Sequence, residues 1–137
     1  QLVEPRFMVT AGAIVLDPQG RVLLLKHRYR AGNGWGIPGG FLEKGEQPDE
    51  ALRRELREEV GLELDTAQLV RARTLRRPRQ VELHYLCRAQ DAGSAIPQSR
   101  EIDKAAWFDP YALPPEINVD QRRIIARALH NGARAGD

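Results

Sequence analysis

Three glutamates, Glu55, Glu58 and Glu59, are the residues of this chain whose type and spacing point most directly to chemistry. Side chains three and four positions apart lie on one face of an α-helix, so a helix through this segment gathers the three carboxylates. Carboxylates that close repel one another unless a cation lies between them, and Mg²⁺ and Mn²⁺ prefer oxygen ligands. The spacing therefore indicates a metal site. The alternative is a solvated, glutamate-rich helix face, which is a common pattern.

The segment in front of the glutamates favours the metal site. It reads WGIPGG from Trp35 to Gly40, with few polar side chains and three glycines. Glycine allows the backbone to approach a ligand closely, and backbone carbonyls are suitable ligands for a hard cation.

The helix that must carry the glutamates has clear boundaries in the sequence. Pro48 suits the first helical turn, where its missing N–H has no intrahelical partner to lose. Gly61 can take the left-handed conformation that ends a helix. A helix over 48–60 is therefore predicted, with an apolar stripe that packs inward: Ala51, Leu52, Leu56 and Val60.

The stretch from Gly40 to Leu62, GFLEKGEQPDEALRRELREEVGL, resembles the complete signature of the Nudix hydrolases, with every specified position filled. The lead-in at 35–39 is also similar to that family, and the resemblance covers most of the chain. It implies an α/β fold, a Nudix-like α/β/α sandwich with a mixed β-sheet between helices. The expected organisation is a single Nudix hydrolase domain over residues 1–137.

The resemblance also implies an activity, hydrolysis of the diphosphate bond in a nucleoside diphosphate linked to another moiety, with Mg²⁺ or Mn²⁺ as cofactor. ADP-ribose or another nucleotide sugar is the favoured substrate, because Pro78 stands where the ADP-ribose-cleaving group of the family has a proline. Two alternatives stay open. One is a pyrophosphohydrolase acting on nucleoside triphosphates or RNA 5′-ends, and the other is a non-catalytic nucleotide-sensing domain.

The resemblance assigns roles to individual residues. It implies that the metal is held by three glutamates and one backbone carbonyl: Glu55, Glu58, Glu59 and Gly39. It also implies that Arg54 pairs with Glu46 and orients the metal-binding carboxylates. A purely structural salt bridge is the alternative for that pair.

The general base is left open by the sequence. Glu101 lies in a segment, 99–108, similar to the loop-then-strand element of the family, and it is a candidate both for the base and for an additional metal ligand. Glu58 is the second candidate for the base. Asp103 is a third, less favoured one.

Five arginines crowd into one short segment, at positions 71, 73, 76, 77 and 79. Arg77 and Arg79 are predicted to bind substrate phosphates. RNA is a less favoured partner for the same cluster. The alternative is positive charge that protects the edge of a sheet from pairing with another strand.

Composition agrees with one small enzyme domain. The chain has 137 residues, of which 42% are hydrophobic and 29% charged, as in ordinary globular proteins. Its one cysteine, Cys87, excludes an internal disulfide and fits a reducing compartment. No apolar stretch is long enough to cross a membrane or to serve as a signal sequence. We expect a cytoplasmic protein with a small-molecule nucleotide substrate and no membrane partner, and a homodimer stays open.

The remaining elements follow from hydrophobic patterns and turn residues. The first two predicted strands are joined as a hairpin by a turn at 18–20. A loop is expected at 91–100 and a terminal amphipathic helix at 120–129. The predicted strands are 7–17, 21–27, 68–76, 80–89 and 105–108.

Overall fold

The computed structural model describes residues 4–28 and 34–135, which form a mixed β-sheet with two long helices. The strands are β1 (Met8–Leu16), β2 (Val22–His27), β3 (Trp35–Gly36), β4 (Gly39–Phe41), β5 (Thr66–Leu75), β6 (Gln80–Arg88) and β7 (Ile102–Phe108). The helices are α1 (Pro48–Val60), a short 3₁₀ turn η1 (Ala92–Ser94), and α2 (Val119–Ala135).

The sheet is organised around β1. Its main path runs β3-β2-β1-β6-β5, with β4 paired to β1 and β7 paired to β2. Strand β1 pairs with β6 in parallel over its whole length, from Met8 opposite Gln80 to Leu16 opposite Arg88. The other strand pairs are antiparallel.

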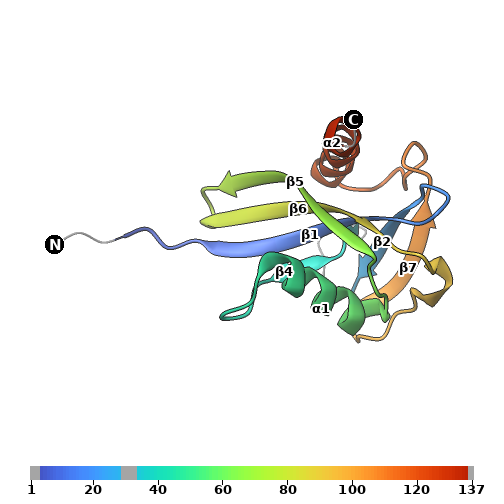
Figure 1. The fold of residues 1–137 in the computed structure, drawn as a ribbon, viewed down its shortest axis with the longest axis horizontal. Helices are drawn as coiled ribbons and strands as arrows, with labels where there is room; N and C mark the ends of the chain where they lie inside the picture. Colours follow the sequence, from blue (N-terminus) through green and yellow to red (C-terminus); the bar gives the residue numbers. More distant parts are fainter. Residues whose placement is uncertain (1–3, 29–33, 136–137) are drawn as a thin grey trace.

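Each face of the sheet buries its own apolar cluster, because successive side chains of a strand point to opposite faces. One cluster joins Ala11, Ala13 and Val15 of β1 to the inner side of α1. The other joins Ile14 and Leu16 to α2. Figure 1 shows α1 and α2 on opposite sides of the sheet. The α/β/α arrangement expected from the sequence is therefore confirmed.

Helix α1 has the boundaries that the sequence predicts. Pro48 occupies its first turn, and Gly61 closes it with φ 66° and an amide that donates to the carbonyls of Arg57 and Leu56. Asp49 and Glu50 lie in the first turn, where a negative charge interacts favourably with the helix dipole. The predicted apolar stripe is buried: Ala51, Leu52, Leu56 and Val60.

Several element predictions were incomplete. The glycine-rich segment forms two short strands, β3 and β4, that were not predicted. The predicted hairpin of the first two strands forms only next to its turn, where Leu16 pairs with Val22. Beyond that point β2 pairs mainly with β7.

Strand β7 and helix α2 are both longer than predicted. Strand β7 begins at Ile102 rather than at 105, because its first residues pair with the end of β2. Helix α2 runs from Val119 to Ala135, beyond the predicted 120–129, and buries Ile124 and Ile125.

Among the described residues, no helix is long and apolar enough to cross a membrane.

Candidate active site

One guanidinium group, that of Arg54, joins three of the acidic residues singled out in the sequence, Glu46, Glu55 and Glu58. Its Nε and Nη2 atoms donate to both carboxylate oxygens of Glu46, at 2.8 and 3.0 Å. Its Nη1 atom donates to Glu55 at 3.0 Å and to Glu58 at 3.3 Å. The carboxylates of Glu55 and Glu58 therefore converge on a single nitrogen atom, as the helical spacing predicts.

This network fixes the charges of the predicted Arg54–Glu46 pair. The hydrogen bond from Arg54, with a further one from the backbone of Glu43, lowers the pKa of Glu46 to about 2. The same pairing raises the pKa of Arg54 above its already high ordinary value. Both groups are ionised across the whole physiological pH range, so Arg54 is a permanent cation among the carboxylates.

Strand β4 connects the acidic network to the rest of the molecule. The carboxylate of Glu55 lies against Gly40, where an added Cβ atom would come within 2.6 Å of its Oε1. At Gly39, which has φ 155°, a Cβ atom would collide with the backbone carbonyl of Ala11. Both glycines are therefore required by close approach, and Nη2 of Arg54 ties the next residue, Phe41, through its carbonyl oxygen at 3.3 Å.

The carboxylates of α1 are chemically suitable ligands for a divalent cation. Carboxylate oxygens are the preferred ligands of Mg²⁺ and Mn²⁺, and those of Glu55 and Glu58 already converge. Glycine at position 40 leaves room for the Glu55 carboxylate beside the backbone of β4. Within residues 4–28 and 34–135, however, no three acidic, histidine or cysteine side chains are gathered closely enough to hold a metal together. The metal site stays a prediction for Gly39, Glu55, Glu58, Glu59 and Glu101.

Glu58 and Glu59 have different surroundings although they are neighbours. Glu58 is 59% exposed, whereas Glu59 is buried near the C-terminal end of α1. The backbone carbonyl of Glu59 accepts a hydrogen bond from the amide of Gln98 at 2.8 Å. The segment before β7 is thereby packed against the end of α1.

Glu101 lies at the end of that same segment, immediately before β7, and is exposed. Its carbonyl oxygen accepts from the amide of Arg28 at 2.8 Å, and its own amide donates to Ser99 Oγ at 3.2 Å. Asp103, the third candidate for the base, forms an ion pair with Arg28 at 2.9 Å. These contacts leave the predicted role of Glu101 untested.

A cleft of about 230 Å³ opens on the α2 side of the sheet, next to β4. Gly39 and Gly40 line it, together with Thr10 and Gly12 of β1. The carboxylate of Glu55 contacts Gly40 from the opposite face of the sheet. The cleft and the acidic network are therefore separated only by the backbone of β4.

The far wall of the cleft is polar. Arg73 of β5 donates to Glu82 of β6 at 2.8 Å and to both carboxylate oxygens of Asp120 on α2, at 2.9 and 2.7 Å. These bonds from Arg73 lower the pKa of Asp120. His84 is only 3% exposed, and its Nε2 lies 3.3 Å from Glu82. Burial lowers the pKa of His84, so its ring is neutral at pH 7.

Most of these cleft residues could not be recognised in the sequence. Glu82, His84 and Asp120 belong to no motif, and they meet only because β5, β6 and α2 pack together. The alternating pattern of the strands was the one available signal, since it places Glu82 and His84 on a common face. Within the arginine cluster it is Arg73 that lines the cleft, while Arg77 and Arg79 are exposed at the β5–β6 turn.

Cys87 is buried in the apolar cluster beneath α1. Burial raises the pKa of its thiol to about 12, so the thiolate is not available as a nucleophile.

Comparison with known proteins agrees with the signature in α1. The NUDIX domain family matches residues 6–128. The chain is 37% identical over 123 residues to the NAD-capped RNA hydrolase NudC of Pseudomonas fluorescens, covering 88% of this chain and 43% of that protein. It is 36% identical over 112 residues to the human 8-oxo-dGDP phosphatase NUDT18, covering 78% of this chain and 34% of that one. The chain thus spans less than half the length of either relative.

The fold has close counterparts among solved structures. A Nudix hydrolase from Nitrosomonas europaea superimposes with a TM-score of 0.80 at 21% identity, over 99% of this chain and 76% of that one. At this level of identity the likeness concerns the fold.

Proposed function

The chain belongs to the Nudix family, and from this premise we propose that it is a pyrophosphohydrolase that uses Mg²⁺ or Mn²⁺ to cleave the diphosphate bond of a nucleoside diphosphate linked to another moiety. The proposed catalytic unit is a single domain over residues 1–137. The observation that carries the proposal is the position of Gly40, which contacts the Glu55 carboxylate and also lines the cleft. A diphosphate bound over β4 would reach the acidic network while an adjoining part of the substrate lies in the cleft.

The proposed roles follow from the contacts of each residue. Glu55, Glu58 and Glu59 would hold the metal with the carbonyl oxygen of Gly39. A bound divalent ion supplies neutralisation of the phosphate charge and a more acidic attacking water. Arg54 holds the carboxylates of Glu55 and Glu58 in position, and its bidentate bond to Glu46 holds Arg54 itself.

We propose Glu58 as the first candidate for the general base, ahead of Glu101. The Glu58 carboxylate is exposed and within hydrogen-bonding distance of Arg54. We keep Glu101 as the second candidate, because its segment is packed against the C-terminal end of α1. A base must ionise before it can accept a proton, so its replacement removes the acidic limb of the pH–rate profile. Profiles of Glu58→Gln and Glu101→Gln will distinguish the two.

The substrate class is supported by the named relatives as well as by the site. NAD-capped RNA and 8-oxo-dGDP differ in size, but both carry phosphates in anhydride linkage on a nucleoside. ADP-ribose and NAD-type dinucleotides are therefore the first compounds to test. An RNA 5′-end is a second candidate, favoured by the name of the Pseudomonas relative and by the arginines near the β5–β6 turn.

The deciding experiment is hydrolysis of a substrate panel by the purified chain with Mg²⁺, with Mn²⁺ and with EDTA. The panel contains ADP-ribose, NAD, nucleoside triphosphates and NAD-capped RNA. We expect metal-dependent cleavage of at least one nucleoside diphosphate derivative. Binding of these compounds without cleavage of any of them would instead support a nucleotide-sensing domain.

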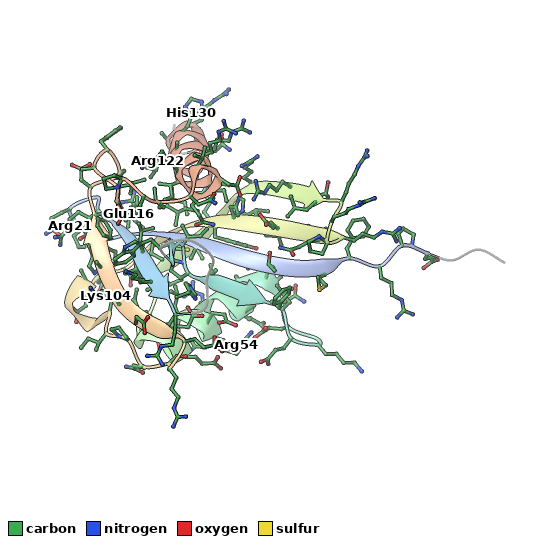
Figure 2. The ribbon with its side chains drawn as sticks, turned by 180° about the vertical axis from the view of Figure 1, so that it is seen from behind. Arg21, Arg54, Lys104, Glu116, Arg122 and His130 are labelled. Carbon is green, nitrogen blue, oxygen red and sulfur yellow. The ribbon has the colours of Figure 1, made fainter. Side chains whose placement is uncertain are left out.

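Variants of the metal-site residues accompany this assay. Glu58→Gln and Glu59→Gln should each remove most of the activity, because each removes negative charge proposed to hold the metal. Glu58 is exposed, so its variant should retain the wild-type circular dichroism spectrum. Glu116→Gln is the matched control, since Glu116 is exposed on the segment before α2 (Figure 2). Undiminished turnover in both metal-site variants would contradict the assignment.

A further inference from the structure

Two large apolar side chains near the cleft are left uncovered by the fold. Phe41, the last residue of β4, is 55% exposed, and Met8, the first residue of β1, is 45% exposed. Phe41 pairs directly with Thr10, which lines the cleft. Directly paired residues place their side chains on one face of a sheet, and so do residues two apart on a strand. Phe41, Thr10 and Met8 therefore share the face on which the cleft opens.

The direction of Phe41 follows independently from its neighbour. A Cβ atom at Gly40 would point at Glu55, on the α1 side of the sheet. Side chains alternate along a strand, so Phe41 points to the opposite, α2 side. Figure 1 shows the β5–β6 turn and the neighbouring end of β1 extending beyond both helices, which leaves this part of the sheet uncovered.

The backbone beneath Phe41 is fixed. Its carbonyl oxygen accepts from Nη2 of Arg54 at 3.3 Å, and the following amide, of Leu42, donates to the carbonyl of Val9 at 3.1 Å. Leu42 itself packs against the apolar cluster under α1. The backbone of Phe41 is thus held at a defined place next to Arg54, and its exposed ring lies on the opposite face of the sheet.

Positive charge borders this apolar surface at the β5–β6 turn. The amide of Met8 donates to the carbonyl of Arg79 at 3.0 Å, and Arg76, Arg77 and Arg79 are exposed at that turn. An aromatic ring that carries phosphates complements such a surface in both shape and charge. An uncharged apolar peptide would meet the ring without using the flanking cations.

The size of the cleft also indicates that part of the substrate lies outside it. Pockets that enclose small ligands usually measure about 300–1,000 Å³, more than the 230 Å³ available here. Part of a nucleotide derivative must therefore lie outside the cleft. The strand that separates the cleft from the acidic network ends at Phe41.

We propose that Phe41, supported by Met8, is the surface on which a heterocyclic base of the substrate stacks, and so a residue that contributes to substrate binding. This inference rests on the proposed function and deepens it, because it assigns one ring of the substrate to a place outside the cleft. Stacking on an aromatic side chain tolerates different bases, since every base has a π-face.

The test is equilibrium binding of AMP in the presence of Mg²⁺, because AMP has a base but no diphosphate bond to cleave. Ribose 5-phosphate, which lacks the base, is the matched ligand. Phe41→Trp should show quenching of the introduced tryptophan by AMP and none by ribose 5-phosphate at equal concentration. Phe41→Ala should bind AMP roughly tenfold more weakly than wild type, the lower part of the range for base stacking, while Phe41→Tyr should bind it as wild type does.

The control is Tyr111→Ala, which removes another aromatic side chain, 97% exposed, on the segment between β7 and α2. Its AMP binding should equal that of wild type. Unchanged AMP binding in Phe41→Ala, or equal quenching by the two ligands, would overturn the proposal. A change of oligomeric state in Phe41→Ala with AMP affinity retained would also overturn it, since the ring would then contact another copy of the chain.

The two proposals can fail separately. If no diphosphate compound is hydrolysed by the wild type, the proposed function fails. If hydrolysis is observed and AMP binding does not depend on Phe41, only the stacking surface fails.

Discussion

Arg54 illustrates how one side chain organises several others. Its three nitrogen atoms reach Glu46, Glu55, Glu58 and the backbone of Phe41 at 2.8–3.3 Å. The planar fork of arginine matches the two oxygens of a carboxylate, whereas the ammonium group of lysine is a single point of charge. Lysine could keep the charge but not this set of contacts.

Arg54→Lys should therefore lower kcat/KM by roughly 10- to 100-fold, the usual effect of losing a group that orients metal-binding residues. Steady-state kinetics on the best substrate of the panel measures it. Arg57→Lys is the matched control on the same helix, because Arg57 makes one exposed ion pair with Glu63 at 3.5 Å. Equal kinetics in the two variants would show that charge alone is needed at position 54.

We expect His84 to make the stability of the protein depend on pH below neutrality. Burial lowers its pKa from the ordinary value of 6.5, opposed by Glu82 and assisted by Arg73 and Arg71. A lowered folded-state pKa means that the unfolded chain binds the proton more readily than the folded protein. The contribution of His84 to the free energy of unfolding is therefore complete above pH 6.5 and is lost as the pH falls.

We expect the free energy of unfolding of the wild type to fall between pH 7.5 and pH 5. His84→Asn should flatten that dependence, because asparagine does not titrate. Urea titrations at several pH values measure the effect, with His130→Asn, at an exposed position, as the control. A wild-type slope retained in His84→Asn would assign the pH dependence to other groups.

At the scale of single residues, local signals in the sequence were enough to predict part of the site. The carboxylates of α1 and Arg54 lie within one helix, so their proximity follows from helical spacing alone. Glu82 and Asp120 are 38 positions apart and meet only at Arg73. No spacing rule reports such a contact.

Among the elements, α2 is held by polar contacts near both of its ends in addition to its apolar face. Arg73 of β5 reaches Asp120 in the first turn of α2, and Asn131 near its other end donates to the carbonyl of Val70 at 3.0 Å. The apolar side chains on the inner face of α2 hold the helix against the sheet. The hydrogen bonds near its two ends fix its orientation relative to β5.

Arg73→Met should destabilise the protein by about 1–3 kcal/mol, because it leaves the half-buried carboxylate of Glu82 without its cation. Hydrogen exchange should increase chiefly in the first turn of α2. Arg123→Met, an exposed position on the same helix, serves as the control. Protection of that turn at the wild-type level in Arg73→Met would show that apolar packing alone holds the helix.

Helix α1 and the longer strands could be predicted because their periodicity and end signals agree, as at Pro48 and Gly61. Strands β3 and β4 could not. They are only two and three residues long and rich in glycine, and they form because β1 and β2 offer free edges to pair with. Pairing over long distances also explains why β7 begins earlier than its own sequence indicates.

For the molecule as a whole, charge is unevenly distributed although the net value is only +2. Arg76, Arg77 and Arg79 are exposed around the β5–β6 turn, beyond the cleft. The backbone of Arg79 adjoins Met8, at the apolar surface proposed to receive a base. These arginines are therefore placed to attract the phosphates of an approaching substrate.

Arg77→Ala combined with Arg79→Ala should raise KM several-fold for a polyanionic substrate and leave kcat nearly unchanged, as expected for loss of uniform binding. The wild-type KM should rise with added salt, and that of the double variant should rise less. Arg122→Ala combined with Arg123→Ala, on α2, removes equal charge elsewhere and is the control (Figure 2 labels Arg122). An unaltered KM would favour protection of the sheet edge as their role.

The parallel pairing of β1 with β6 has a consequence for biosynthesis. Strand β1 is among the first parts of the described chain to leave the ribosome, yet its partner ends only at Arg88, which pairs with Leu16. Translation adds about 5–20 residues per second, so β1 waits several seconds for the strand that completes the middle of the sheet. During that interval we expect the apolar residues of β1 to be exposed. A nascent chain halted before β6 should therefore bind chaperones, and one released after Arg88 has emerged should not.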